Sequence, residues 1–555
     1  MNERLVLNRL MSPCIRLLVV WIFWLGPVGM LTAAPEEIPM PDTQVHEFVS
    51  QHTGRHYQLR IGLPRNYDPA NRSYTVVYQT DGQWDFDRVF PMLRAMEYDQ
   101  IAEPFILVAM TYAGNNPDYG ALRQMDYTPT DFVGGGQSGQ AHLFLRTVRN
   151  EIIPLVEANY ACRTDERILM GSSYGGLFTC YALLHAPDLF TGYVPSSPSL
   201  WVDNYVMVRE ATTFGPGLRG RNLRVRMITG LNEAYGQRNS AERFLAALQA
   251  LGIQDLDIDL EFAANERHGA VAQVAYYEGL PEVVRPKLVT FARGTGEPVN
   301  WSGTQIVQTF HADDVMRVTD AGTGAKRRAM VFEPGDERAT SVGGVIYVLD
   351  AQWDLRYTDA TYWALDYDGE LSNRLRVGLD WEGSPREIMT WREQEYRWLD
   401  DTVDAAAPVV GGAFRSYFGD TVQPWAEGNL VTAPGFRMVI ASEKAATWAL
   451  ADLLSHAPMF DRYLLVSPDV GDAGGNLRML EAARAERGGS LTARVLIYSG
   501  NNEAVERREN LQAFVSQLAQ RGHAGLEISH TQLDYKGYAQ AKLEGYHKGL
   551  RILGR

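Results

Sequence analysis

The 555-residue sequence has few cysteines, no excess of positive charge and almost no long apolar run. Its 52 lysines and arginines stand against 67 aspartates and glutamates, which gives a net charge of −15 at pH 7. Nucleic acids and anionic membranes are bound by basic faces, so this balance argues against both as partners. No cluster of cysteine and histidine has the spacing of metal ligands, so the sequence predicts neither a metal nor a cofactor.

The one long apolar run lies near the N-terminus. It covers residues 17–31, about 15 residues, whereas a membrane-spanning helix needs roughly 20. Arg9 and Arg16 precede it, and small residues ending at Ala34 follow. This order is typical of a secretory signal peptide. We therefore expect residues 1–34 to be removed and the mature chain to be periplasmic or secreted, without a membrane span; a membrane anchor is the alternative.

The three cysteines do not indicate a disulfide framework. Cys14 lies in the expected signal peptide. An oxidising compartment would permit a bond between Cys162 and Cys180. The segments that carry these two residues flank a predicted strand, which holds them apart, so a disulfide is not favoured.

The sequence repeats itself once, with a period of about 270 residues, far longer than the unit of a solenoid. The matching segments follow in the same order: residues 80–85 return at 349–354, 167–172 at 437–442, 185–187 at 456–458, and 230–234 at 500–504. Duplication of a whole domain explains this order, and copies of about 250 residues have the size of a large domain. We expect the copies at 36–293 and 305–555, joined by a Gly/Pro-bearing linker at 294–304.

Within a copy, short apolar runs alternate with segments of helical periodicity. Four runs of the first copy read as strands, namely 75–78, 105–110, 168–170 and 225–228. The first three are nearly continuous apolar runs, which is typical of a sheet covered on both faces. Helical periodicity occupies residues 141–158 and 241–251. The predicted fold is α/β, a mostly parallel sheet with helices on both faces, present twice.

The most specific motif is Gly171-Ser172-Ser173-Tyr174-Gly175, which follows a predicted buried strand and opens an apolar helix. Such a strand-to-helix turn is the nucleophile elbow, G-x-S-x-G, whose central serine is exposed at the apex of a strained turn. Ser173 is therefore the candidate nucleophile, and Ser172 occupies a variable position. The alternative is a Gly/Ser-rich turn that only caps a helix.

A serine hydroxyl needs a base within hydrogen-bond reach, and the base needs an orienting acid. In this fold the chain order is serine, acid, histidine. Glu233 follows a predicted strand and is the acid candidate, with Asp255 or Asp257 as less well placed alternatives. His268 follows a late strand and is the base candidate, and His185 is a weaker rival.

The tetrahedral intermediate requires hydrogen-bond donors for its oxyanion. The backbone N–H of Tyr174, the residue after the nucleophile, is expected to be one of them. A second should come from the turn after an early strand, where Gly82 and Gln83 are both candidates. An ordinary Asp-Gly turn is the alternative for that segment.

Taken together, these motifs resemble the putative esterase family, which includes esterase D and the enterochelin-esterase-like periplasmic esterases. The resemblance is good over residues 45–290 and loose in the second copy; the motifs are 80–84, 171–176, 197–201, 230–233 and 268–269. It implies an α/β-hydrolase sheet that hydrolyses ester or thioester bonds. It also implies that Ser199 and Trp201, together with Trp84, lie beside the substrate pocket.

The second copy lacks the residues of this chemistry. Glu443 stands where the first copy has its nucleophile, and alanines replace the flanking glycines. The base position aligns with Lys536, and only the acid is kept, as Glu503. We expect a degenerate domain that packs against the first copy as a built-in dimer partner or shapes its substrate cleft. New chemistry that uses Glu443 and Lys536 is the alternative.

The sequence therefore predicts an exported serine esterase that acts on a small-molecule ester through a Ser-His-Glu triad in the first domain. Sugar-linked acyl esters, siderophore esters and small thioesters all fit. Two further hypotheses stay open: a non-catalytic ligand-binding protein built on two esterase scaffolds, and an acyltransferase that shares the acyl-enzyme.

Overall fold

The computed structural model describes residues 36–284, 309–334, 340–396, 412–471, 474–534 and 536–555. The predicted signal peptide at 1–34 and linker at 294–304 lie outside these residues. The predicted limits of the two domains stay predictions.

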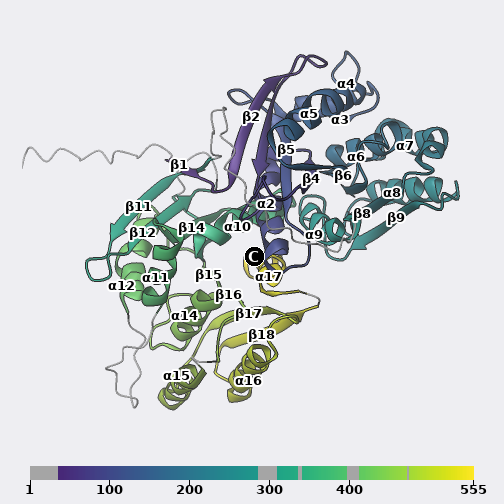
Figure 1. Cartoon of the computed structure of the whole chain (residues 1–555). Coiled ribbons are helices and arrows are strands. Elements are labelled where there is room, and N and C mark those ends of the chain that lie inside the picture. Colours follow the sequence, from purple (N-terminus) through teal and green to yellow (C-terminus); the bar gives the residue numbers. More distant parts are fainter. Residues whose placement is uncertain (1–35, 285–308, 335–339, 397–411, 472–473, 535) are drawn as a thin grey trace, which may run out of the picture.

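Two eight-stranded sheets form the molecule, one from each half of the chain (Figure 1). The first has the order β2-β3-β5-β4-β6-β7-β8-β9, in which β3 is antiparallel to both of its neighbours and all other pairs are parallel. Its strands are β2 Thr43–Val49, β3 His56–Gly62, β4 Tyr74–Gln79, β5 Phe105–Tyr112, β6 Cys162–Ser172, β7 Gly192–Ser196, β8 Leu223–Gly230 and β9 Leu256–Ala263.

The second sheet repeats this topology with the order β11-β12-β14-β13-β15-β16-β17-β18, and β12 is again the antiparallel exception. Its strands are β11 Asp314–Thr319, β12 Lys326–Phe332, β13 Gly344–Leu349, β14 Arg374–Trp381, β15 Arg437–Ser442, β16 Arg462–Val466, β17 Ala493–Gly500 and β18 Leu526–Leu533. The predicted fold, a duplicated and mostly parallel α/β sheet, is confirmed.

Helices cover both sheets. Those of the first half are α2 Gly82–Tyr98, α3 Tyr119–Tyr127, α4 Ala141–Thr147, α5 Ile153–Asn159, α6 Tyr174–His185, α7 Val202–Phe214, α8 Tyr235–Gln249 and α9 Val271–Val283. Those of the second half are α10 Ala351–Tyr367, α11 Pro385–Glu395, α12 Ala413–Tyr417, α13 Gln423–Glu427, α14 Glu443–Leu454, α15 Gly474–Arg487, α16 Val505–Arg521 and α17 Tyr538–Leu553. The helix predicted over 141–158 is α4 and α5 joined by a π-helical turn at Val148–Ile152.

The central strands are apolar because both faces are covered. Every residue of β4 and β5 is buried, as the continuous apolar runs predict. The edge strand β9 instead alternates between half-buried and exposed side chains along most of its length. The sheet therefore places its buried strands at the centre, and their carboxyl ends lead into the turns that carry the candidate site.

The two halves share one hydrophobic core. A single cluster of buried side chains includes Phe86 and Tyr276 from the first half and Leu355, Tyr357 and Tyr546 from the second. It is formed where α2 packs against α10 and α17, near the centre of the molecule (Figure 1). A short strand β1, Glu36–Pro39, also pairs with β10, Thr309–Ala312. Because the core is continuous, the two halves are packed together as one body.

Cys162 and Cys180 are both free, so the disulfide that the sequence disfavours is not formed between them. Across the parts of the chain that the structure describes, no helix has the length and apolar character needed to span a bilayer.

Candidate active site

Ser173 lies at the turn between β6 and α6, with φ 59° and ψ −117°. A positive φ is unusual for a residue with a side chain, and such strain persists only where the surroundings enforce it. A Cβ at Gly171 would overlap the carbonyl of Gly175, and one at Gly175 would overlap Thr80 Oγ1. Glycines are thus required at these two positions, because Thr80, directly after β4, and the turn itself leave no room for a Cβ. The glycines of the motif therefore explain the sharp turn.

The segment 196–199, which begins at the last residue of β7, holds the serine in place. Ser173 N donates to Ser196 O at 3.0 Å, and Ser199 N donates to Ser173 O at 3.0 Å. Ser173 Oγ lies 3.4 Å from Ser199 Oγ, and this is its hydrogen bond within the described residues. Ser199, predicted from family resemblance to line the pocket, therefore directly contacts the candidate nucleophile.

Glu233 lies in the loop after β8 with its side chain only 3% exposed. Its Oε1 accepts from the backbone N–H of Gly230 at 2.8 Å and from Ser197 Oγ. Its Oε2 lies 2.5 Å from His268 Nδ1. A buried carboxylate whose oxygens all have partners is held in one orientation. The structure thus brings together the acid and the base that the sequence singles out.

The alternative residues lie elsewhere. Asp257 pairs with Arg226, and Asp255 accepts from the backbone N–H of Asn222, just before β8. His185 pairs with Glu210. None of these three side chains is bonded to the imidazole or to the candidate serine in the described part of the chain.

His268 follows β9 and its side chain is 32% exposed. Because Nδ1 is bonded to Glu233, Nε2 is the nitrogen left for proton transfer. Among the described residues, Ser173 Oγ is bonded to Ser199 rather than to this nitrogen. The segment 196–199 connects the two halves of the site, since Ser196 and Ser199 bond the serine and Ser197 bonds the acid.

The candidate oxyanion donors lie at two helix N-termini. Tyr174 begins α6 and Gly82 begins α2, so the N–H groups of their first turns have no partner within the helix. A Cβ at Gly82 would lie 2.9 Å from the Cβ of Ala109, which explains the glycine. The side-chain amide of Gln83 accepts from Thr111 and donates to Asp81, so its backbone N–H is the candidate donor.

A buried ion pair beside these helices was not predicted. Arg123 of α3 binds both carboxylate oxygens of Asp81, with distances of 2.8 and 2.7 Å. Its guanidinium carbon lies 5.1 Å from the ring centroid of Tyr174 and 5.5 Å from that of Trp84. Asp81 has a positive φ of 57° at the start of α2, so the ion pair fixes a strained turn next to the candidate oxyanion donors.

Exposed aromatic side chains border the site. Trp84 is 48% exposed and Trp201 is 43% exposed. The indole of Trp201 donates to Gln237 Oε1 at 2.8 Å, and Gln237 Nε2 donates to the carbonyls of Ser197 and Pro198. Gln237 therefore links the exposed tryptophan to the segment that orders the serine and the acid. Sequence patterns give no signal for Gln237, because it acts on backbone carbonyls of a turn that is distant along the chain.

In the second half, the predicted alignment of Lys536 with His268 is wrong. Asn502 N donates to the carbonyl of Lys536 at 3.0 Å, and the equivalent amide in the first half donates to the carbonyl of Glu266 at 3.0 Å. Lys536 is thus the counterpart of Glu266, and Tyr538 is the counterpart of His268. The error arose because this loop carries no repeated motif, and only its hydrogen bonds define the register.

The elbow of the second half keeps its strained backbone and has a glutamate at its apex. Glu443 has φ 49°, and its carboxylate lies 3.7 Å from Arg392 and 4.0 Å from Arg507. Glu503 occupies the position equivalent to Glu233. One of its carboxylate oxygens likewise accepts from a backbone N–H and a serine hydroxyl. The hydroxyl of Tyr538 is bonded to Ser442 at 3.0 Å. The described residues at this site therefore include neither a serine at the apex nor an imidazole beside the acid.

The first half of the chain is similar to known esterases. Residues 50–255 match the family described as putative esterase. The siderophore triacetylfusarinine C esterase of Aspergillus fumigatus is 27% identical over 186 residues, 32% of this chain and 63% of that protein. The apo-salmochelin esterase of Escherichia coli is 33% identical over 173 residues, 29% of this chain and 52% of that protein. The chain thus spans between half and two thirds of the length of these relatives.

Among solved structures, the BES protein from Bacillus cereus aligns with 45% of this chain and 99% of its own, with a TM-score of 0.42 and 23% identity. The family resemblance that the motifs indicate is confirmed over residues 50–255, which match the family described as putative esterase.

Proposed function

We propose that the first domain is a serine esterase with Ser173 as nucleophile, His268 as general base and Glu233 as the orienting acid. The observation that carries this proposal is the 2.5 Å contact between Glu233 Oε2 and His268 Nδ1, joined to the strained elbow through the segment 196–199. The match of residues 50–255 to an esterase family supports it independently.

In the reaction, Ser173 Oγ attacks the ester carbonyl carbon while His268 Nε2 accepts the hydroxyl proton. The nucleophile and base reach hydrogen-bond distance in the substrate complex, as is common for such pairs. Glu233 keeps Nδ1 protonated and facing away from the substrate. The N–H groups of Tyr174 and of Gly82 or Gln83 stabilise the oxyanion.

Collapse of the tetrahedral intermediate breaks the ester C–O bond, and His268 returns the proton to the departing alcohol. Water then attacks the acyl-enzyme by the same route and releases the acid. Transfer of the acyl group to another alcohol would share every step up to this one, and product analysis with an added alcohol distinguishes the two outcomes.

One relative described above is named a siderophore esterase and the other an apo-salmochelin esterase. The exposed rings of Trp84 and Trp201 offer apolar surface for an acyl or alcohol group. We propose siderophore-type esters as the first substrates to assay, with sugar-linked acyl esters and small thioesters in the same panel. The second domain is proposed to be non-catalytic, and the export of the chain through residues 1–34 remains a prediction.

Fluorophosphonate labelling tests the assignment directly. We expect wild-type protein to be labelled at Ser173 and Ser173→Ala to be unlabelled, with a loss of kcat/KM of about 10⁴-fold or more on any ester that is cleaved. Ser172→Ala, the neighbouring serine of the same turn, is the matched control and should be labelled like wild type. Undiminished labelling of Ser173→Ala would contradict the proposal. Protein that takes no label and cleaves no ester in the panel would favour a ligand-binding role.

A further inference from the structure

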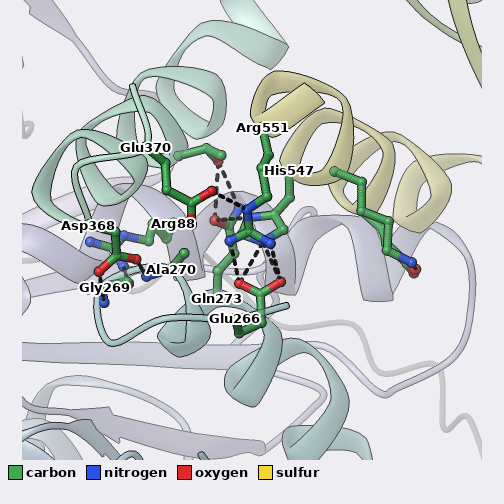
Figure 2. A network of polar contacts seen from close by, with 12 residues as sticks. Arg88, Glu266, Gly269, Ala270, Gln273, Asp368, Glu370, His547 and Arg551 are labelled. Carbon is green, nitrogen blue, oxygen red and sulfur yellow. Dashed lines mark hydrogen bonds and ion pairs between the residues drawn. The ribbon is translucent and has the colours of Figure 1, made fainter. Parts of the chain in front are cut away.

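The second domain reaches into the loop that carries His268. Asp368, which follows α10, accepts hydrogen bonds from the backbone N–H groups of Gly269 and Ala270, each at 2.8 Å (Figure 2). These are the two residues directly after the histidine, and they lead into α9. A carboxylate at this position satisfies N–H groups that the helix itself leaves unpaired and interacts favourably with the helix dipole. The N-terminus of α9 is therefore capped from the other domain.

The contact leaves little room for the loop to move. A Cβ at Gly269 would lie 2.8 Å from a ring carbon of Tyr367 and 2.9 Å from the carbonyl oxygen of Ala364, both in α10. From the first domain, Arg88 donates to the Gly269 carbonyl at 3.3 Å. The residue next to His268 is thus enclosed by the end of α10 on one side and by α2 on the other.

A second attachment holds the loop on the other side of the histidine. Glu266 is 5% exposed and accepts two hydrogen bonds of 2.7 Å from Arg551 of α17, and His547 of α17 lies 3.2 Å from both carboxylate oxygens (Figure 2). Burial raises the pKa of Glu266, but the hydrogen bonds from Arg551 and His547 outweigh it and bring the pKa to about 2. Arg551 is itself held by Glu370, at 3.1 Å. His268 is therefore flanked at both ends by contacts from the second domain.

The duplicated fold contains an equivalent of the Asp368 cap, in which the first domain caps a helix of the second. Asp99, which follows α2, accepts from the N–H groups of Ala539 and Gln540 at 3.1 and 2.8 Å. This cap lies beside Tyr538, where the second domain has no histidine. The ion pair of Glu266 with Arg551 has no equivalent among the described residues. The counterpart of Glu266 is Lys536, which contacts the ring of Tyr277 instead. Within the described residues, the ion-pair attachment thus occurs on the side that carries His268 and not at its counterpart.

We propose that Asp368 is a positioning residue for the esterase reaction and that the degenerate domain completes the active site of the first domain. This inference rests on the proposed function. The imidazole is one-third exposed and is held within the described residues by a single hydrogen bond, to Glu233, so its position depends on the backbone of residues 266–270. A displacement of about 1 Å in a catalytic group can cost roughly 10²-fold in rate. The role is one of geometry, because Asp368 contacts backbone amides rather than the imidazole.

Asp368→Asn and Asp99→Asn form a matched pair for the test. Each replaces a carboxylate that accepts from two N–H groups with an amide that can accept from one and turns an NH2 toward the other. Both variants should lower the melting temperature by similar amounts, because the two caps are equivalent. We expect Asp368→Asn alone to lower kcat, by roughly 10- to 100-fold, with KM changed less than about threefold, and to slow fluorophosphonate labelling in parallel.

Arg551→Lys provides a second variant that keeps the charge but cannot bind both oxygens of Glu266. Arg551→Lys should also lower kcat, but by a smaller factor than Asp368→Asn. The ring resonance of His268 in histidine-labelled protein, assigned with His268→Gln, provides a readout that needs no substrate. It should shift or broaden in Asp368→Asn and stay unchanged in Asp99→Asn.

The inference is overturned if Asp368→Asn and Asp99→Asn change kcat by the same factor. It is also overturned if both variants leave kcat and the His268 resonance unchanged. Wild-type labelling at Ser173 with unchanged kinetics in Asp368→Asn would reject the positioning role while the esterase assignment stands. Conversely, an inactive and unlabelled wild type would reject the esterase assignment, and the His268 resonance would still decide whether Asp368 positions the imidazole.

Discussion

Replacing Glu266 by glutamine should weaken the contact between the two domains in a pH-dependent way. The substitution keeps the shape of the side chain and removes its charge, so that Arg551 loses a buried partner (Figure 2). The pKa of Glu266 falls from its usual 4.5 to about 2. At about 1.4 kcal/mol for each pKa unit, the charged carboxylate contributes about 3 kcal/mol to the folded structure. The loss of one partner of a buried ion pair commonly costs about 3–5 kcal/mol, which agrees with this value.

The sign of the pH dependence follows from the direction of the shift. Because the folded-state pKa is depressed, the contribution is fully present above about pH 4.5 and is lost as the pH falls toward 2. The difference between wild type and Glu266→Gln should therefore be about 3 kcal/mol at pH 7 and about 1 kcal/mol at pH 3. Below pH 2 the two proteins should have nearly the same stability.

Urea unfolding followed by tryptophan fluorescence at pH 7 and pH 3 measures these differences. Glu242→Gln, a change on the exposed face of α8, is the control and should stay within about 0.5 kcal/mol of wild type at both pH values. If wild type and Glu266→Gln lost equal stability between pH 7 and pH 3, Glu266 would not be held as a charged group by the second domain, and the reasoning would be refuted.

Two further predictions concern the elbows. Gly175→Ala should destabilise the protein by about 1–3 kcal/mol and slow labelling, because its Cβ would overlap Thr80 Oγ1. Gly236→Ala in α8, where no atom lies within 4 Å of the new Cβ, should instead be neutral or stabilise by up to about 1 kcal/mol, and equal urea midpoints for the two variants would contradict this account. Glu443→Ser, made in Ser173→Ala protein, should take no fluorophosphonate label, since the described residues offer no imidazole there; the appearance of label would show a second competent site.

The local parts of the candidate site were predictable from sequence. The elbow depends on glycines and a serine within a few residues of each other, so its motif is visible in one short segment. Glu233 and His268 could be found because the carboxyl ends of parallel strands meet at one edge of a sheet, and chain order then identifies the acid and the base. The observed 2.5 Å contact between them agrees with that order.

Residues that act across the fold gave no such signal. Arg123 binds Asp81 from another helix, and its partner depends on how α3 packs rather than on any spacing. Lys536 was assigned to the wrong position because the loop after β18 has no motif, and its register is defined by a hydrogen bond to Asn502. Asp368 could not be recognised at all, since it lies far along the chain from the amides that it caps.

By itself, the sequence determined the duplicated α/β fold, the strained turn at Ser173 and the order of the candidate triad, because periodicity, glycine spacing and chain order are local properties. Only the tertiary structure decided which carboxylate meets the imidazole and that the second half of the chain caps the helix after His268. The physical reason is that hydrogen bonds between distant segments depend on how loops pack within a sheet and how the two sheets pack through their shared core, and neither composition nor spacing encodes that packing in a readable form.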